Sequence, residues 1–284
     1  MTDLKKTKMA DSGPPHHYFS PDMMIWRIDR EKALLLAGGR ALLMQLAHPK
    51  VASGVAQHSH FEDDPLGRLH RTMSSMWSIV FDEVPAASAA LERVKSVHKR
   101  VHGTVKAGES LPAGAPYDAL DVNLLLWVHA TLIDSALLVY DLFVKRLTHD
   151  ERSRYYEDSK ILGRLFEIPE SLVPPNLEGF NQYVNRMLTG DEVAVGPTAK
   201  SLAAEILHPR PWILKPAGPL FRLITAGLLP EPLREAYGLR WDDRMRKYFS
   251  FVIKSAGWLI PILPGPVRIV PNARRSENHL SPRK

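Results

Sequence analysis

Two histidines four residues apart, His98 and His102, stand in the stretch RVKSVHKRVHG at residues 93–103. On a helix this spacing brings both side chains near one face, where they could share a metal ion. A tetrahedral zinc site needs further ligands, and no Asp or Glu accompanies the pair at a useful helical offset. An inward-facing histidine could instead ligate iron, or it could be a core histidine that hydrogen-bonds a carbonyl group.

Helical periodicity predicts different positions for the two histidines. At about 100° per residue, one third of the circumference carries an apolar stripe, formed by Leu91, Val94, Val97, Val101 and Val105. His98 falls inside this stripe, while His102 lies at its edge, about 40° away. Gly103 is a good residue to end the helix. We therefore expect His98 to face the interior.

The preceding helix, predicted to start at Asp64-Pro65, carries a group of side chains suited to binding an anion. Its second stripe is small and hydroxylated, with Arg71 beside it, and consists of Arg68, Thr72, Ser75 and Ile79. Residues 65–81 contain no acid that could pair with Arg68 or Arg71. Buried arginines here would need an external propionate, phosphate or carboxylate, and the alternative is plain solvent exposure.

Other histidines offer competing sites. His129 shares an apolar helical face and is the main competitor to His98 as an iron ligand, although a structural role suits it too. A non-haem metal site could use His48, His58 and His60 together with Asp63 or Asp64.

Composition and charge exclude several kinds of cofactor and several classes of protein. The chain has 284 residues, 45% of them hydrophobic, a net charge of +6 and no cysteine. The absence of cysteine excludes disulfides, thiolate nucleophiles, iron–sulfur clusters and a Cys-ligated haem. No basic block is dense enough for nucleic-acid binding, and the N-terminus lacks a secretory signal, which predicts a cytoplasmic protein.

Helical signals dominate the chain and predict one all-α domain at residues 21–262, between a mobile tail at 1–20 and a C-terminal tail at 263–284. The expected helices include 23–36, 39–57, 121–146, 197–208, 216–229 and 241–259. Charged residues interrupt the apolar run Val122–Val144, so we expect a buried helix rather than a membrane span. The segment GWLIPILPGPVRIV could pack on a neighbour or lie on a lipid surface.

Three segments in order carry a family resemblance: GGRALLMQLAHPKVASGVAQHSHFEDDPLGRLHRTM, then RVKSVHKRVHG, then PYDALDVNLLLWVHATLIDSALLVYDLFVKRLTHDERSRYYED. Their combination resembles the catalytic domain shared by latex-clearing rubber oxygenases and MpaB-type oxygenases, over roughly residues 21–245. The resemblance implies a helical fold that encloses a b-type haem, with one histidine as the proximal iron ligand. The family's Arg-Val-x-x-x-His-x-x-Val-x-Gly pattern assigns that role to His98.

The rubber oxygenases also carry Arg-x-x-Lys-Thr on the distal side of haem, and Arg68-Leu-His-Arg-Thr72 resembles it here. Arg68 and Thr72 match, whereas Arg71 replaces the lysine. A guanidinium stays protonated, so Arg71 is not expected to copy an acid–base or ligating role of lysine. By this resemblance Arg68, Arg71 and Thr72 are the expected catalytic residues, which would organise the distal side of haem, and Arg68 and Arg71 would also bind the cofactor.

These observations predict a haem b oxygenase that uses dioxygen on an apolar substrate, such as an unsaturated or isoprenoid-like chain. An electron donor and peripheral membrane contact would both be compatible with that function. Two alternatives stay open: a haem-binding sensor, storage or electron-transfer protein without turnover, and a non-haem metal enzyme.

Overall fold

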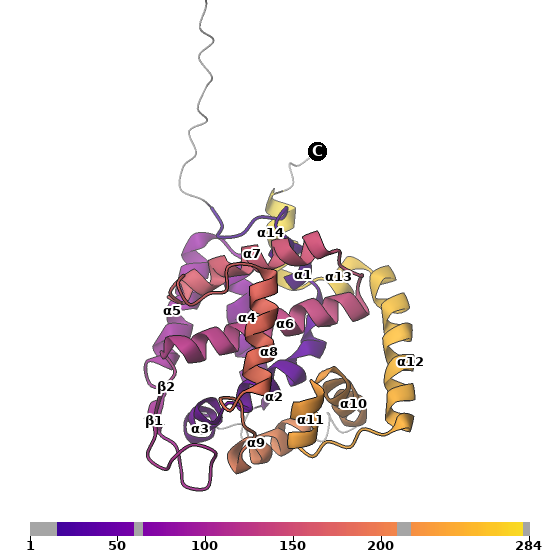
Figure 1. Ribbon diagram of the computed structural model, residues 1–284. Coiled ribbons are helices and arrows are strands. Elements are labelled where there is room, and N and C mark those ends of the chain that lie inside the picture. The colour runs from indigo at the N-terminus through magenta and orange to yellow at the C-terminus, as the bar shows by residue number, and fades with distance from the viewer. Residues whose placement is uncertain (1–15, 60–64, 209–216, 281–284) are drawn as a thin grey trace, which may run out of the picture.

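A 22-residue apolar helix, α6 (Val122–Phe143), crosses the centre of the protein and packs against helices on several sides (Figure 1). The structure is a computed structural model that describes residues 16–59, 65–208 and 217–280. The other α-helices are α1 (Met24–Asp29), α2 (Gly38–Leu46), α3 (Pro49–His58), α4 (Pro65–Phe81), α5 (Val84–His98), α7 (His149–Leu165), α8 (Leu177–Thr189), α9 (Pro197–Leu207), α10 (Gly218–Leu228), α11 (Glu231–Ala236), α12 (Asp243–Leu259), α13 (Gly265–Arg268) and α14 (Pro271–Leu280). Two 3-10 helices, η1 (Lys32–Ala37) and η3 (Ile260–Ile262), complete the helical elements described. The all-α prediction is confirmed.

Helix α6 lies in the core because most of its residues are apolar. Asp121 caps its first turn by accepting a hydrogen bond from the Asn123 backbone N–H at 2.9 Å. Its apolar residues then face neighbours around most of the circumference, with α7 above it and α8 crossing it in Figure 1. By length and composition α6 could cross a membrane, yet 67% of its most apolar window is buried inside the protein. The predicted buried helix is present.

The core divides into a large cluster and a smaller one. The large cluster joins α1, α2, α4, α6, α7, α8 and α9 around buried aromatic residues such as Trp26, Trp127 and Phe180. The smaller cluster joins η1, the C-terminal half of α6 and α10 through Ala37, Val139, Phe143, Ile224 and Leu228, and one face of α12 covers it. Helix α12 itself has no fully buried residue and lies at the right-hand edge in Figure 1.

Several sequence signals start helices where predicted. Thr148 and Glu151 form a reciprocal capping box at α7, and the Asn176 side chain accepts from the Gly179 N–H at the start of α8. Two expected helices are each divided. The segment 23–36 becomes α1 and η1, and 39–57 becomes α2 and α3 because His48 precedes Pro49 and adopts an extended backbone.

The predicted helix through Gly103 is wrong, since α5 ends at His98. The chain turns and forms β1 (His102–Thr104), which pairs antiparallel with β2 (Pro116–Asp118) in the register His102–Asp118. A Cβ at Gly103 would lie 2.7 Å from the Tyr117 hydroxyl. Gly103 therefore permits the close approach of the two strands rather than capping a helix.

The predicted tails also need correction. Phe19 is buried in the core, so the described part of the N-terminal segment, residues 16–20, packs on the domain, and residues 1–15 lie outside the described chain. Residues 263–280 form α13 and α14 instead of a free tail. Val270 and Ala273 are buried, and Glu277 accepts from the Trp26 indole N–H at 2.9 Å.

Candidate functional site

His98 is the last residue of α5 and is half-buried. Its Nδ1 atom is buried and has no hydrogen-bond partner, which is rare for a buried polar atom. Burial lowers the pKa of its imidazole, so the ring is neutral near pH 7. A neutral imidazole with an unsatisfied nitrogen is the form that ligates a metal.

The surroundings of His98 can be located from the contacts of Lys95 and Val101, which stand three residues before and after it. On the N-terminal side, Lys95 forms an ion pair with Glu167, just beyond α7, at 2.6 Å. On the C-terminal side, Val101 approaches Gly54 of α3, where an added Cβ would lie 3.3 Å away. Helix α4 packs along α5. His98 therefore lies at the end of α5, between one residue that contacts Glu167 and another that approaches α3.

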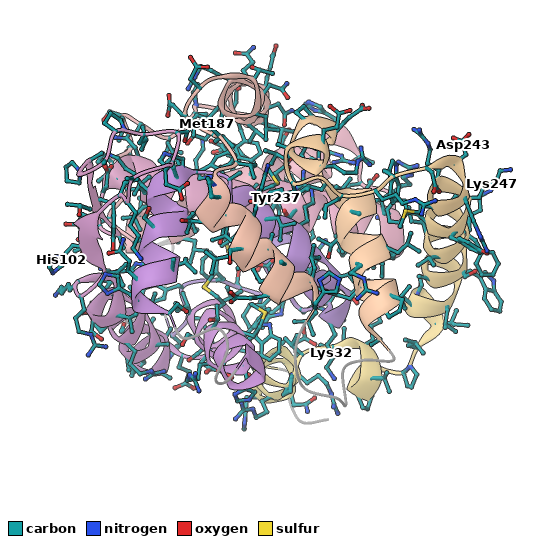
Figure 2. All side chains as sticks on the ribbon, turned by 90° about the horizontal axis from the view of Figure 1, so that it is seen from below. Lys32, His102, Met187, Tyr237, Asp243 and Lys247 are labelled. Atoms are coloured by element: carbon teal, nitrogen blue, oxygen red, sulfur yellow. The ribbon has the colours of Figure 1, made fainter. Side chains whose placement is uncertain are left out.

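The apolar stripe predicted around His98 is only partly correct. Leu91 is buried and Val94 is half-buried, but Val97 is 49% exposed. Val101 and Val105 follow the end of α5, so helical periodicity does not apply to them. His102 is an exposed residue of β1 and projects from the edge of the molecule in Figure 2. The two histidines do not form a helical pair, which removes the shared zinc site.

His129 differs from His98 in having a partner. It lies buried on α6, and burial lowers its pKa to about 4, opposed by a hydrogen bond with the Ser159 backbone of α7. Its Nε2 lies close to Gly163, one turn further along α7, where an added Cβ would be 3.6 Å away. The ring thus fastens α6 to α7. This arrangement supports a structural role for His129.

The α4 side chains show a gradient of exposure. Thr72 is exposed, Ser75 is half-buried and Ile79 is fully buried, so the stripe turns inward toward the C-terminal end of α4. Arg71 is exposed at the same end as Thr72. The side chain of Arg68 lies outside the described residues, as do Asp64 and the cap that it was predicted to form.

The described residues of the predicted non-haem metal site do not lie close enough together to share a metal ion. His48 and His58 lie at opposite ends of α3, about 15 Å apart along the axis. Each has a partner: His48 Nδ1 accepts from the Lys50 N–H at 3.3 Å, and His58 Nε2 bonds the His102 carbonyl at 3.1 Å. His60, Asp63 and Asp64 lie outside the described residues. Among the residues that are described, no three His, Asp or Glu side chains cluster as a metal site would need.

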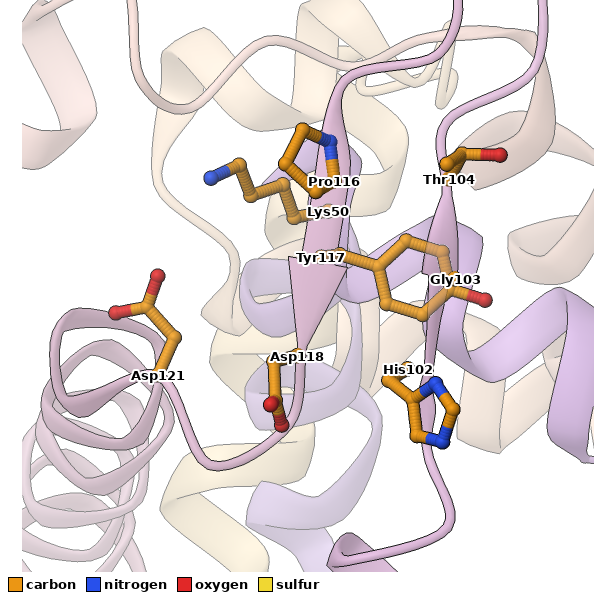
Figure 3. A pocket seen from close by; sticks show the side chains of 8 residues that line it. All are labelled: Lys50, His102, Gly103, Thr104, Pro116, Tyr117, Asp118 and Asp121. Carbon is orange, nitrogen blue, oxygen red and sulfur yellow. The ribbon is translucent and has the colours of Figure 1, made fainter.

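An open pocket of about 510 Å³ lies beside the β1–β2 hairpin (Figure 3). Lys50 and Asp121 line it from the starts of α3 and α6, and His102 and Asp118 line it from the paired strands. Beside these four ionisable side chains, Pro116 and Tyr117 also line the pocket, so its lining is mixed in character.

Sequence reasoning missed two buried polar features. Arg40 of α2 is buried and forms an ion pair with Asp134 of α6, while also donating to Ser135 Oγ and to the Leu228 carbonyl of α10. Trp127 of α6 is fully buried with no partner for its indole N–H. The interruptions of the apolar α6 sequence at Asp134 and Ser135 were the signal for the first, whereas an apolar helix gives no signal for the second.

Comparison with known proteins places the chain in a family. Two mycobacterial proteins, uncharacterized protein Mb2261 of Mycobacterium bovis and uncharacterized protein Rv2237 of Mycobacterium tuberculosis, are each 25% identical over 236 residues, covering 81% of this chain and 88% of the relative. No solved structure matches the chain. Residues 25–258 match the family described as ER-bound oxygenase mpaB/B'/Rubber oxygenase, catalytic domain. Because that match spans most of the sequence, the chain belongs to this family and carries an oxygenase catalytic domain.

Proposed function

We propose that the protein is a haem b-dependent oxygenase that uses dioxygen to oxidise an apolar substrate, with an unsaturated or isoprenoid-like chain as the substrate class. The observation that carries the proposal is the state of His98: a neutral imidazole, partly enclosed, with a buried nitrogen that lacks a partner. It also stands at the histidine of the pattern by which the chain resembles its family. His129 has a hydrogen bond with the Ser159 backbone and is the weaker candidate.

In this proposal each residue has a separate role. His98 would hold the haem through its imidazole ring. Arg68 and Arg71 would bind carboxylate groups of the cofactor, and the Thr72 hydroxyl would donate a hydrogen bond on the same side. Bound haem would supply the one-electron and dioxygen chemistry that side chains lack. Arg71 would act through fixed positive charge, because a guanidinium does not exchange its proton near pH 7.

The visible absorption spectrum after haem supplementation tests cofactor binding. We expect a Soret band in the wild-type protein and its loss in His98→Ala. His102→Ala is the matched control, because this histidine is only four residues away but exposed on β1, and it should keep the band. A colourless wild-type protein, or equal spectra for the two variants, would refute the assignment.

Oxygen consumption tests turnover separately. The haem-loaded protein with a reductant should consume oxygen faster when unsaturated lipids, prenyl chains or terpenoids are added. Thr72→Val should lower this rate while leaving the Soret band in place. Arg71→Met should also lower it, and should weaken haem binding, because the guanidinium is proposed to hold a cofactor carboxylate. A haem-loaded protein that consumes no oxygen with any of these compounds would instead support the non-catalytic haem protein, and stoichiometric zinc or manganese with negligible iron would support a non-haem enzyme.

A further inference from the structure

Helix α12 is apolar on two separate faces, and one of them packs on the described part of the domain. The inner face covers the smaller core cluster and comprises Phe249, Val252, Ile253 and Ala256. At 100° per residue, Tyr248, Phe251, Ser255 and Trp258 form a separate stripe on the outer side. A surface helix needs one apolar stripe to pack on its domain. The outer stripe therefore has no function in the fold described here.

The outer stripe consists of large side chains that are well exposed. Phe251 and Trp258 are 69% and 73% exposed, and Ile262, just beyond the helix in η3, is 64% exposed. Tyr248 and Leu259 lie on the same side of the helix and are each about half exposed. Clustered exposed apolar residues of this size mark an interaction surface rather than ordinary surface scatter.

Positive charge flanks this surface. Arg244 lies within the outer stripe on the helical wheel and stacks over the Tyr248 ring, whereas Arg246 lies on the other side of the helix and pairs with Asp243 at 3.4 Å. No Asp or Glu occurs from Arg244 to Val267. Lys247 and Lys254 stand beside the outer stripe on the helical wheel, and Lys247 projects at the outer edge of the molecule in Figure 2. Lys254 also lines an open pocket at the end of α6 with Lys145, Arg146 and Asp141, and Asp141 pairs there with Arg146 at 2.8 Å. The combination of aromatic residues with flanking cations is typical of helices that lie in a membrane interface.

The positive charge of this surface favours an anionic lipid bilayer over a second copy of the chain as its binding partner. A second copy of the chain would bring the same lysines and arginines face to face, and like charges in an interface are unfavourable. An anionic bilayer would instead attract Lys247 and Lys254 beside the stripe. Its acyl region would accept Phe251, Trp258 and Ile262.

We propose that the outer face of α12, together with η3, docks peripherally on the surface of an anionic lipid bilayer. The aromatic side chains insert at the level of the headgroups, and Lys247 and Lys254 contact lipid phosphates. Because the helix remains attached to its core through the inner face, docking requires no rearrangement of the domain.

Co-sedimentation with vesicles tests the proposal on the full chain. Vesicles of phosphatidylcholine alone and of phosphatidylcholine with about one third phosphatidylserine are compared at about 0.1 M and about 0.5 M salt. We expect binding to the anionic vesicles at low salt and loss of that binding at high salt or without phosphatidylserine. Phe251→Ser/Trp258→Ser and Lys247→Glu/Lys254→Glu should each lower the ratio of bound to free protein at least about tenfold.

A matched control and a local probe complete the experiment. Leu172→Ser/Lys200→Glu changes an exposed apolar residue and an exposed lysine elsewhere, and it should bind like the wild type. Tryptophan emission should shift to shorter wavelength on binding, and Trp258→Phe should remove most of that shift while retaining binding. Absence of vesicle binding, or equal losses in the control and test variants, would overturn the proposal. So would a dimer seen by sedimentation velocity that Phe251→Ser/Trp258→Ser dissociates in a protein that ignores vesicles.

Discussion

At the scale of single residues, the proposed ligand role of His98 can be separated from a structural one by a cavity variant. If His98 is the haem ligand, the Soret band should weaken or disappear in His98→Gly. Free imidazole can enter the space left by the side chain and should restore the band, whereas a misfolded variant would not respond. His98→Gly that keeps the circular dichroism of the wild type but stays colourless with imidazole would contradict the role of His98.

A second residue-scale prediction concerns Asp29 of α1. Burial raises the pKa of its carboxyl group from 3.8 to about 7, opposed by a hydrogen bond from the Tyr155 hydroxyl at 3.0 Å. Between about pH 4 and pH 7 the folded state then binds more protons than the unfolded state, so the free energy of unfolding falls as the pH rises through this window. Asp29→Asn, which can still accept from Tyr155, should remove this contribution.

Urea unfolding at several pH values measures that contribution as a difference between the two proteins. His48 and His129, whose pKa values are lowered to about 4 by burial, contribute the opposite slope between about pH 6.5 and pH 4. Both proteins share these histidines, so their effect cancels in the difference. The stability of wild type relative to Asp29→Asn should fall with rising pH by at most about 1.4 kcal/mol per pH unit. A difference that does not vary with pH would refute the raised pKa.

At the scale of the element, alanine is expected to have opposite effects on the free energy of unfolding at two adjacent glycines of α2. A Cβ at Gly39 would overlap the Thr225 hydroxyl and lie 3.1 Å from the Phe221 ring of α10, while a Cβ at Gly38 would meet nothing within 4 Å. Gly39→Ala should therefore lower the free energy of unfolding by about 1–3 kcal/mol. Gly38→Ala should leave it unchanged or raise it by up to about 1 kcal/mol, because alanine favours the helix. Equal unfolding midpoints in denaturant would contradict the close contact of α2 with α10.

Elements with local start signals could be predicted from the sequence, and elements that depend on distant contacts could not. Thr148, Glu151 and Asn176 cap their own helices, so their sequence neighbours suffice. The end of α5 depends on strand pairing with Pro116–Asp118 and on the Tyr117 ring beside Gly103, which lie outside any local window. The same limit explains Val97: it matches the helical period but is exposed near the end of the helix.

At the scale of the whole molecule, the inward position expected for His98 agrees with its partial burial, while its role at the candidate site stays a prediction. An inward position for His98 followed from Leu91 and Val94 on the same face, and both are at least partly buried. The absence of a partner for Nδ1 depends on the tertiary packing around the end of α5, which no spacing rule gives. The packing of residues 263–280 was missed for a related reason, since their partners on α1 and at Glu31 are more than 200 residues away.

That long-range contact can be tested through one ion pair. Arg268 binds Glu31 through two hydrogen bonds of 2.7 and 2.8 Å, and Glu31 is only 2% exposed. Arg268→Ala leaves a buried carboxylate without its counter-charge, which should lower the free energy of unfolding by about 3–5 kcal/mol. Arg268→Ala/Glu31→Gln should recover part of this loss, because the uncompensated charge is gone. Arg30→Ala breaks the more exposed pair with Glu277 and should cost less than about 1 kcal/mol. Equal losses for Arg268→Ala and Arg30→Ala in urea unfolding would contradict the larger contribution expected of the buried pair.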